Sequence, residues 1–126
     1  DASAAVELLL RGPAAADLER RLFADGEKLH APHLIDLKVA QVLRRGALAG
    51  STASVADAAL DVWRLMPVRR HAHDLLLPRI WQLKESLGAY DAAYVALAEA
   101  LNAPLVTTDA KLGRAHGHSA RVIVAR

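Results

Sequence analysis

The sequence has no cysteine, few aromatic residues and no long hydrophobic run. Its 126 residues include only two Trp, two Tyr and one Phe. The lack of cysteine excludes a disulfide framework, thiol catalysis and thiolate zinc sites, and it is typical of a reducing compartment. The longest apolar run, around Ala92–Ala98, is far shorter than the roughly 20 residues of a membrane helix. Because the first residues also lack the basic segment of a signal peptide, we expect a cytoplasmic protein that does not enter a membrane.

The sequence also has little net charge, because its positive and negative residues are nearly equal in number. Sixteen Lys and Arg face fourteen Asp and Glu, which gives a formal net charge of +2. This balance is too weak to indicate a nucleic-acid partner by itself, and the few aromatic residues disfavour a base-stacking platform. A composition of 53% hydrophobic and 24% charged residues excludes general disorder. With no repeat or linker in view, the length predicts a single domain over 1–126.

The predicted elements are mostly helices, with short strands between them. Apolar residues recur at helical spacing over much of the chain, and Gly and Pro mark the ends of the segments. The last third runs in the order helix, Pro-marked turn, strand, helix, strand, which is typical of an α/β fold with a parallel sheet. We predict a helix-rich α/β sandwich in which helices flank a short parallel central sheet. Helices are expected over 3–11, 14–24, 33–45, 51–65, 74–87, 90–101 and 110–115, and strands over 28–31, 68–71, 105–108 and 121–124.

Three carboxylates stand where the apolar pattern does not require them. Asp91 opens the most apolar helix of the chain, and Asp109 follows a buried strand at the end of a sheet where sites commonly lie. Asp1 precedes the first helix. Each has an ordinary structural explanation as well: Asp91 as a first-turn acid, Asp109 as a helix N-cap and Asp1 as a frayed terminus. If the three converge, their oxygens suit Mg²⁺ or Mn²⁺, and that chemistry is usually phosphodiester hydrolysis.

Four segments in the same order resemble the PIN-domain ribonucleases, and in particular the VapC toxins of bacterial toxin–antitoxin modules. The longest is Tyr90-Asp91-Ala92-Ala93-Tyr94-Val95-Ala96-Leu97-Ala98-Glu99-Ala100-Leu101, followed by Pro104-Leu105-Val106-Thr107-Thr108-Asp109. The opening Asp1-Ala2-Ser3-Ala4 is similar to the family's Asp-x-Ser motif. The second motif is matched by Ala31-Pro32-His33-Leu34 with Val42-Leu43-Arg44-Arg45. The resemblance spans nearly the whole chain.

The resemblance implies a Mg²⁺- or Mn²⁺-dependent endoribonuclease whose site holds about four acids. Matched by position, Asp1, Asp91 and Asp109 take three of these places, with Ser3 and Thr107 beside the metal and its waters. It also implies a bacterial cytoplasmic toxin that forms homodimers, acts on RNA and is covered by a cognate VapB-type antitoxin.

Two departures from the family pattern bear on this expectation. The family's second acid, a Glu four residues past the Leu of the second motif, falls here on Lys38. The family also has a central strand of apolar residues before its first Asp, and this chain starts at Asp1, so we expect that strand to be missing.

Lys38 leads to opposing expectations. Placed within about 4 Å of the carboxylates, its ammonium would repel a divalent ion by roughly 4 kcal/mol per unit charge. We therefore expect impaired cleavage. The alternative is that Lys38 extends to solvent and the three Asp bind metal without it. Asp36 is not expected to replace the missing Glu, since it lies about 200° round the helix from position 38.

Other patterns leave weaker candidates. The spacing of His71 and His73 and of His116 and His118, with His30 and His33, invites a zinc site, although no third ligand stands at a fixed spacing. Of the basic pairs, Arg44-Arg45 and Arg69-Arg70 are candidates to bind RNA phosphates or simply to face solvent. Two rival functions stay open: a catalytically inactive protein of the same fold that sequesters antitoxin or RNA, and an unrelated helical regulator, which would require the three Asp to lie far apart.

Overall fold

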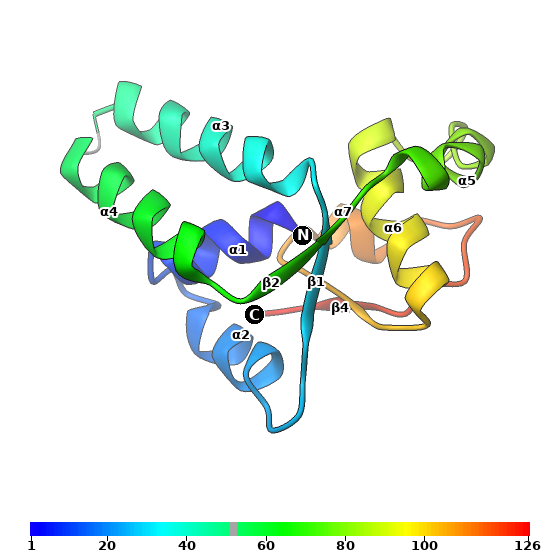
Figure 1. Ribbon diagram of the computed structural model, residues 1–126, viewed down its shortest axis with the longest axis horizontal. Coiled ribbons are helices and arrows are strands. Elements are labelled where there is room, and N and C mark those ends of the chain that lie inside the picture. The colour runs from blue at the N-terminus through cyan, green and yellow to red at the C-terminus, as the bar shows by residue number, and fades with distance from the viewer. Residues whose placement is uncertain (51–52) are drawn as a thin grey trace.

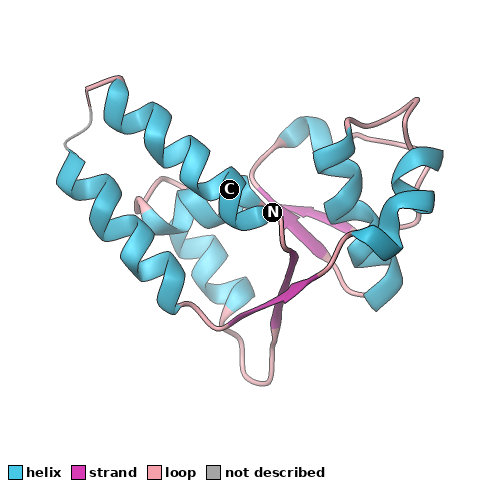
Figure 2. Cartoon of the chain, turned by 45° about the horizontal axis from the view of Figure 1, so that its top comes forward, coloured by secondary structure: helices cyan, strands magenta, loops and turns pink. Residues whose placement is uncertain are grey.

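The computed structural model describes residues 1–50 and 53–126. Short strands lie in the middle of the molecule and helices cover them on both sides (Figures 1 and 2). No helix in the part of the chain that the structure describes is long and apolar enough to cross a membrane. The helices are α1 (Ala2–Leu9), α2 (Ala15–Leu22), α3 (Ile35–Leu48), α4 (Ala53–Leu65), the 3₁₀ turn η1 (Asp74–Leu76), α5 (Leu77–Gln82), α6 (Ala89–Leu101) and α7 (Ala110–Gly113). The strands are β1 (Leu29–Pro32), β2 (Val68–His71), β3 (Leu105–Thr107) and β4 (Val122–Val124).

The strands form two parallel pairs. β1 pairs with β2 so that Leu29 lies opposite Val68, and β3 pairs with β4 so that Leu105 lies opposite Val122. A cavity of about 170 Å³ lies between the pairs and is lined from β1 by Leu29, His30 and Ala31 and from β3 by Leu105 and Val106. The predicted parallel α/β arrangement is confirmed, although the described strands make two short sheets instead of one.

Two groups of helices hold the strands. On one side α3 packs against α1 and α4, and on the other α5 packs against α6 (Figure 1). The central helix α6 is buried on nearly all sides: each residue of 92–98 is less than one-tenth exposed. This is the outcome predicted from its apolar sequence. It ends at Asn102, which adopts a left-handed conformation (φ +48°) and closes the helix before Pro104.

The sequence misjudged some boundaries. The single helix expected over 74–87 is a 3₁₀ turn followed by the short α5, which ends at Gln82. His73, and not Asp74, holds the N-cap position of that turn. The reason is local: Pro78 is favourable in the first turn of α5 but has no N–H for a continuous helix from Asp74. The caps expected at Ser51 and Thr52 lie outside the described residues.

A clamp centred on Asp36 joins α3, α4 and β2. The carboxylate accepts a hydrogen bond of 2.7 Å from Trp63 Nε1, and Arg70 Nε donates to both of its oxygens at 2.8 and 3.0 Å. The Arg70 guanidinium also lies over the Trp63 ring, 5.4 Å from its centre. Asp36 therefore points away from the acidic residues, as its place on the helix predicts, and Arg70 is engaged in the core of the fold.

Asp36→Asn is expected to destabilise the fold by about 2 kcal/mol, because it leaves a half-buried guanidinium without its counter-charge. The measurement is the free energy of unfolding in urea at pH 7. Asp57→Asn is the matched control, since Asp57 is exposed on α4 and its carboxylate forms no ion pair among the described residues. Equal unfolding free energies for the two variants would contradict the assigned role.

Glu99 fixes the loop that leads to β4. Its carboxylate accepts from Arg79 Nε and Nη2 at 2.9 and 3.0 Å and from the Ser119 hydroxyl at 2.9 Å. These interactions, that with Arg79 above all, lower the pKa of Glu99 from 4.5 to about 2. The ionised form is therefore bound more favourably in the folded chain than in the unfolded chain.

Glu99→Gln is expected to cost about 2 kcal/mol at neutral pH. Because the pKa of Glu99 is lowered on folding, its contribution is present above pH 4.5 and is lost as the pH falls towards about 2. Urea unfolding of both proteins at pH 7, 5 and 3 tests this. A stability difference between them that stays constant over this range would show that the Glu99 charge is not responsible.

Candidate active site

Asp1, Ser3 and Thr107 form a hydrogen-bonded group where α1 begins and β3 ends. Asp1 caps α1 by accepting from the backbone N–H of Ala4. Its Oδ1 also accepts from the Ser3 hydroxyl, and its Oδ2 from the Thr107 hydroxyl, both at 2.8 Å. Residues more than a hundred positions apart in the chain therefore meet. Asp1 is therefore held by hydrogen bonds, and the alternative explanation of a frayed terminus does not apply.

The two hydroxyls join Asp1 to the end of β3. Ser3 and Thr107 each have one O–H directed to Asp1, and their oxygens lie 3.2 Å from each other. Both oxygens also act as acceptors, Ser3 Oγ from the Thr108 N–H at 3.1 Å and Thr107 Oγ1 from the Asp109 N–H at 2.9 Å. Thr107 is completely buried, so the arrangement is rigid.

Asp109 lies directly after β3 and caps α7. Its Oδ1 accepts from the Lys111 N–H at 2.8 Å, so its predicted N-cap role is present. The carboxylate is exposed to solvent, and the hydrogen bond from its own N–H to Thr107 holds it next to the Asp1 group. Asp109 can therefore cap α7 and also contribute its carboxylate to the candidate site.

Asp91 faces this group from the first turn of α6. Burial raises its pKa, and the negative charge of Asp109 raises it further. The charge of Lys38 acts in the opposite direction. Two carboxylates that repel each other in a half-buried place favour a cation between them or a proton on one of them.

Lys38 reaches the site from α3. Its ammonium lies over the ring of Tyr90, 4.9 Å from the ring centre, and Tyr90 is the residue before Asp91. It forms no ion pair within 4.0 Å with an Asp among the described residues, but its charge lowers the pKa of Asp91. Lys38 thus takes a position intermediate between the two expectations: it forms no ion pair with an Asp among the described residues, and it does not extend freely into solvent. Tyr90 could not be predicted as a site residue from the sequence, because a cation–π contact between two helices leaves no regular spacing along either of them.

The donor set partly fits a divalent metal. Carboxylate and hydroxyl oxygens are the hard ligands that Mg²⁺ and Mn²⁺ take, and the mutual repulsion of Asp91 and Asp109 is the electrostatic condition for binding one. Among residues 1–50 and 53–126, however, no three His, Asp or Glu side chains are grouped closely enough to hold an ion.

A buried hydroxyl belongs to the same region. Tyr94 is 4% exposed, and its hydroxyl has no hydrogen-bond partner in the described part of the chain. Burial raises the pKa of this phenol, the backbone N–H of Ala2 nearby lowers it, and the charge of Asp91, one turn earlier, raises it. The Tyr94 hydroxyl is therefore a buried neutral group within electrostatic reach of Asp91. It could not be predicted from the sequence, because its apolar neighbours make Tyr94 look like an ordinary core residue.

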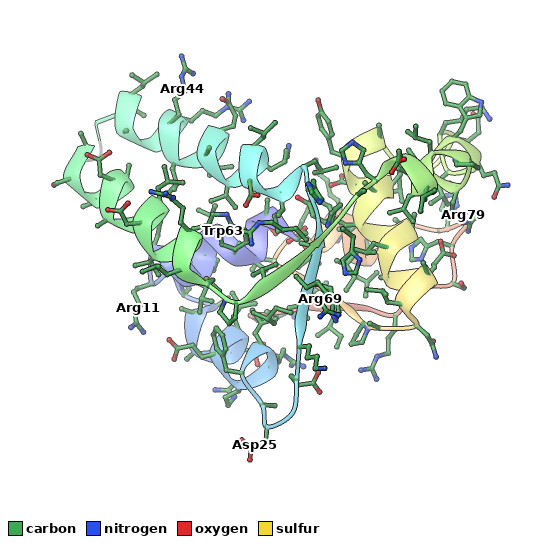
Figure 3. The ribbon with its side chains drawn as sticks, in the orientation of Figure 1. Arg11, Asp25, Arg44, Trp63, Arg69 and Arg79 are labelled. Carbon is green, nitrogen blue, oxygen red and sulfur yellow. The ribbon has the colours of Figure 1, made fainter. Side chains whose placement is uncertain are left out.

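The other predicted candidates are separated from the acids or engaged elsewhere. Arg70 pairs with Asp36. Arg44 and Arg45 lie on an exposed part of α3, and Figure 3 shows Arg44 pointing away from the molecule. The zinc spacing expected for His71 and His73 is not used: His71 instead meets His30, with 2.9 Å between the His71 Nε2 and His30 Nδ1 atoms.

Comparison with known proteins agrees with this geometry. The family model of the PIN domain matches residues 1–117. The chain is 47% identical over 113 residues to Ribonuclease VapC9 of Mycobacterium tuberculosis, which covers 89% of this chain and 85% of that protein. It is 41% identical over 123 residues to Ribonuclease VapC12 of the same organism, covering 97% and 94%. Ribonuclease VapC1 is 40% identical over 119 residues, covering 93% and 89%. Together with the parallel α/β fold, these matches over most of the chain show that it belongs to the PIN-domain family.

Proposed function

We propose that this chain is an endoribonuclease of the VapC type, the toxin of a bacterial toxin–antitoxin system, and that it hydrolyses RNA phosphodiester bonds with Mg²⁺ or Mn²⁺. The observation that carries the proposal is the hydrogen-bonded group of Asp1, Ser3 and Thr107, with the backbone N–H of Asp109 bound to it and Asp91 within electrostatic reach of Asp109. The match to the PIN-domain family model covers all of these positions, and the relatives are named as ribonucleases.

Each side chain has a distinct part in the proposed reaction. Asp91 and Asp109 supply the carboxylates that would hold the metal, and Asp1 is the third acid of the set. Ser3 and Thr107 orient the Asp1 carboxylate by donating to its two oxygens. A bound Mg²⁺ or Mn²⁺ supplies a water of lowered pKa and neutralises charge at the phosphorus. The N–H groups of Thr108 and Asp109, held by the same two hydroxyls, fix the loop on which Asp109 lies.

Lys38 is proposed to impair this activity. Its ammonium stands over Tyr90 and acts on Asp91 in the way that a bound cation would. A divalent ion at the carboxylates would therefore meet a fixed positive charge, and its affinity would fall.

The alternative function is a catalytically inactive protein of the same fold that binds antitoxin or RNA without cleavage. The observation that favours it is Lys38 at the position where the family resemblance places a Glu.

A cleavage assay with a structured RNA separates the two functions. The purified chain is titrated with MgCl₂ and MnCl₂, and Asp109→Asn is run in parallel. Slow cleavage that needs metal, stops with EDTA and is lost in Asp109→Asn is the expected result. RNA binding without cleavage by the chain, even at high metal, would favour the inactive alternative.

The proposed partners are RNA, a VapB-type antitoxin and a second copy of the chain, in a bacterial cytoplasm. Two exposed apolar groups support protein partners. One consists of helix residues on α3 and α4, Leu37, Leu48, Val55, Val62 and Leu65, and the other of residues on η1 and α5, Leu75, Leu77 and Trp81. Sedimentation velocity of the chain alone would measure whether it forms the proposed homodimer.

A further inference from the structure

A second pocket lies apart from the acids, where β1 and β2 begin. Its volume is about 400 Å³, and its walls come from the end of α2, the loop that follows it and the first residues of the two strands. Lys28, His30 and Arg69 line it. It adjoins the first cavity, with which it shares Leu22, Glu27, Lys28, Leu29 and His30, but none of Asp1, Asp91 and Asp109 lines it.

The pocket gathers positive charge that the protein does not neutralise. His30 and Arg69 are direct partners in the β1–β2 ladder, and Lys28 precedes β1. Neither Lys28 nor Arg69 forms an ion pair in the part of the chain described by the structure. Glu27 is the only acid in the lining. Arg69 and Lys28 are thus positive groups without a counter-charge in the described part of the chain, an arrangement that favours a bound anion.

The direction of the Arg69 side chain follows from the alternation of side chains along β2, as a comparison with the neighbouring Arg70 shows. Successive residues of a strand point to opposite faces. Arg70 turns towards α3 and α4 and is held by Asp36, whereas Arg69 turns to the other face and lies beside the crossing of β1 and β2 (Figure 3). Arg70 thus stabilises the fold through its ion pair with Asp36, whereas Arg69 forms no ion pair among the described residues and can bind a ligand.

His30 is held in place by His71. The His30 Nδ1 and His71 Nε2 atoms lie 2.9 Å apart, and the rings are tilted by 33°. This bond leaves the Nε2 atom of His30 as its free ring nitrogen. Burial lowers the pKa of His30. The charges of His71, Arg69 and Lys28 lower it further, which places these basic groups within electrostatic reach of the imidazole.

An apolar wall completes the pocket. Phe23, which is 49% exposed, stands on one side with Leu22, and Pro67 on the other. An exposed aromatic ring next to free cations suits a ligand that combines a phosphate with a planar base, since the base stacks on the ring and the phosphate pairs with guanidinium and ammonium groups. We propose that this pocket binds a nucleoside phosphate, either a free nucleotide or the 5′-phosphorylated end of an RNA strand, with Lys28, His30 and Arg69 holding the phosphate.

The test is binding to the full chain in EDTA, which keeps metal from the acidic site. Ligands are 5′-AMP, adenosine, and a short oligoribonucleotide with and without a 5′-phosphate. We expect 5′-AMP to bind more tightly than adenosine and to shift the ring resonances of His30 and His71 in NMR spectra. Arg69→Gln is expected to weaken 5′-AMP binding about tenfold, and Lys28→Gln to weaken it in the same direction.

Arg44→Gln is the matched control, because it removes the same charge from an exposed arginine on α3 that lines neither pocket. Tighter binding of the 5′-phosphorylated oligonucleotide than of 5′-AMP identifies the RNA end as the ligand, and the reverse order identifies the free nucleotide. The proposal is overturned if 5′-AMP binds no more tightly than adenosine, or if Arg69→Gln and Arg44→Gln bind 5′-AMP equally. Since cleavage is not measured, neither result depends on the proposed nuclease activity.

Discussion

Lys38→Glu is expected to increase Mg²⁺-dependent RNA cleavage on the order of 100-fold at limiting metal. The substitution replaces an ammonium that acts on Asp91 with a carboxylate that adds a metal ligand. The change in charge at the site is two units, and both units favour a divalent ion. The measurement is the initial rate of cleavage against Mg²⁺ concentration, and we expect the half-saturating concentration to fall as the rate at low metal rises.

Two control variants show whether the effect on cleavage depends on position 38 or only on the net charge of the protein. Lys84 also lies over an aromatic ring, 5.2 Å from the centre of Trp81, but its charge is not among those that shift the pKa of Asp91. Lys84→Glu makes the same change in net charge and should leave cleavage unchanged. Lys38→Gln, which removes the repulsion without adding a ligand, should give an intermediate rate. If the unmodified chain cleaves RNA as fast as Lys38→Glu, Lys38 does not impair the site, and the view that it extends harmlessly towards solvent is correct.

Asp91→Asn has the second largest expected effect, and its two consequences have opposite signs. In the Lys38→Glu background it should lower cleavage by at least about 100-fold, because it removes a metal-binding carboxylate. Without metal it should stabilise the fold by about 1 kcal/mol, because a half-buried negative charge facing Asp109 is replaced by a neutral amide of similar shape. The measurements are cleavage rates with Mg²⁺ and thermal unfolding in EDTA.

Asp61→Asn, an exposed acid on α4, is the control for loss of one negative charge. It should change neither cleavage nor the melting temperature. A loss of activity in Asp91→Asn together with a lower melting temperature would mean that Asp91 serves the fold and not the metal. Unchanged activity would remove Asp91 from the proposed site altogether.

Local chemistry made much of the fold predictable. The apolar residues of α6 leave no polar face, so the helix had to be buried, and Asn102 with Pro104 marked its end. The cap at Asp109 was also predictable, since this residue follows a strand and precedes a short helix, whereas the cap expected at Asp74 was wrong. The break before α5 was harder, because Pro78 is compatible both with the first turn of a helix and with a turn before it.

The sequence by itself determined which residue types stand at the motif positions. It identified the acids Asp1, Asp91 and Asp109, the hydroxyls of Ser3 and Thr107, and the lysine in place of an expected glutamate at position 38. These are properties of single positions in an ordered pattern, and a pattern is visible without coordinates. The sequence alone did not show which of these residues meet, since Asp1 and Thr107 are 106 positions apart and only the packing of α1 against β3 brings their side chains to 2.8 Å.

Tertiary structure decided how each charged group is used. Arg69 and Arg70 are adjacent in sequence, yet strand alternation gives one to the Asp36 clamp and the other to an open pocket. His71 pairs with His30 on the neighbouring strand and not with His73, because ladder register sets which rings come together. Lys38 rests on Tyr90, a contact between two helices that no spacing along one helix predicts. Side-chain partners across elements depend on how those elements pack, and for a charge the partner determines whether it stabilises the fold, opposes a metal or remains free for a ligand.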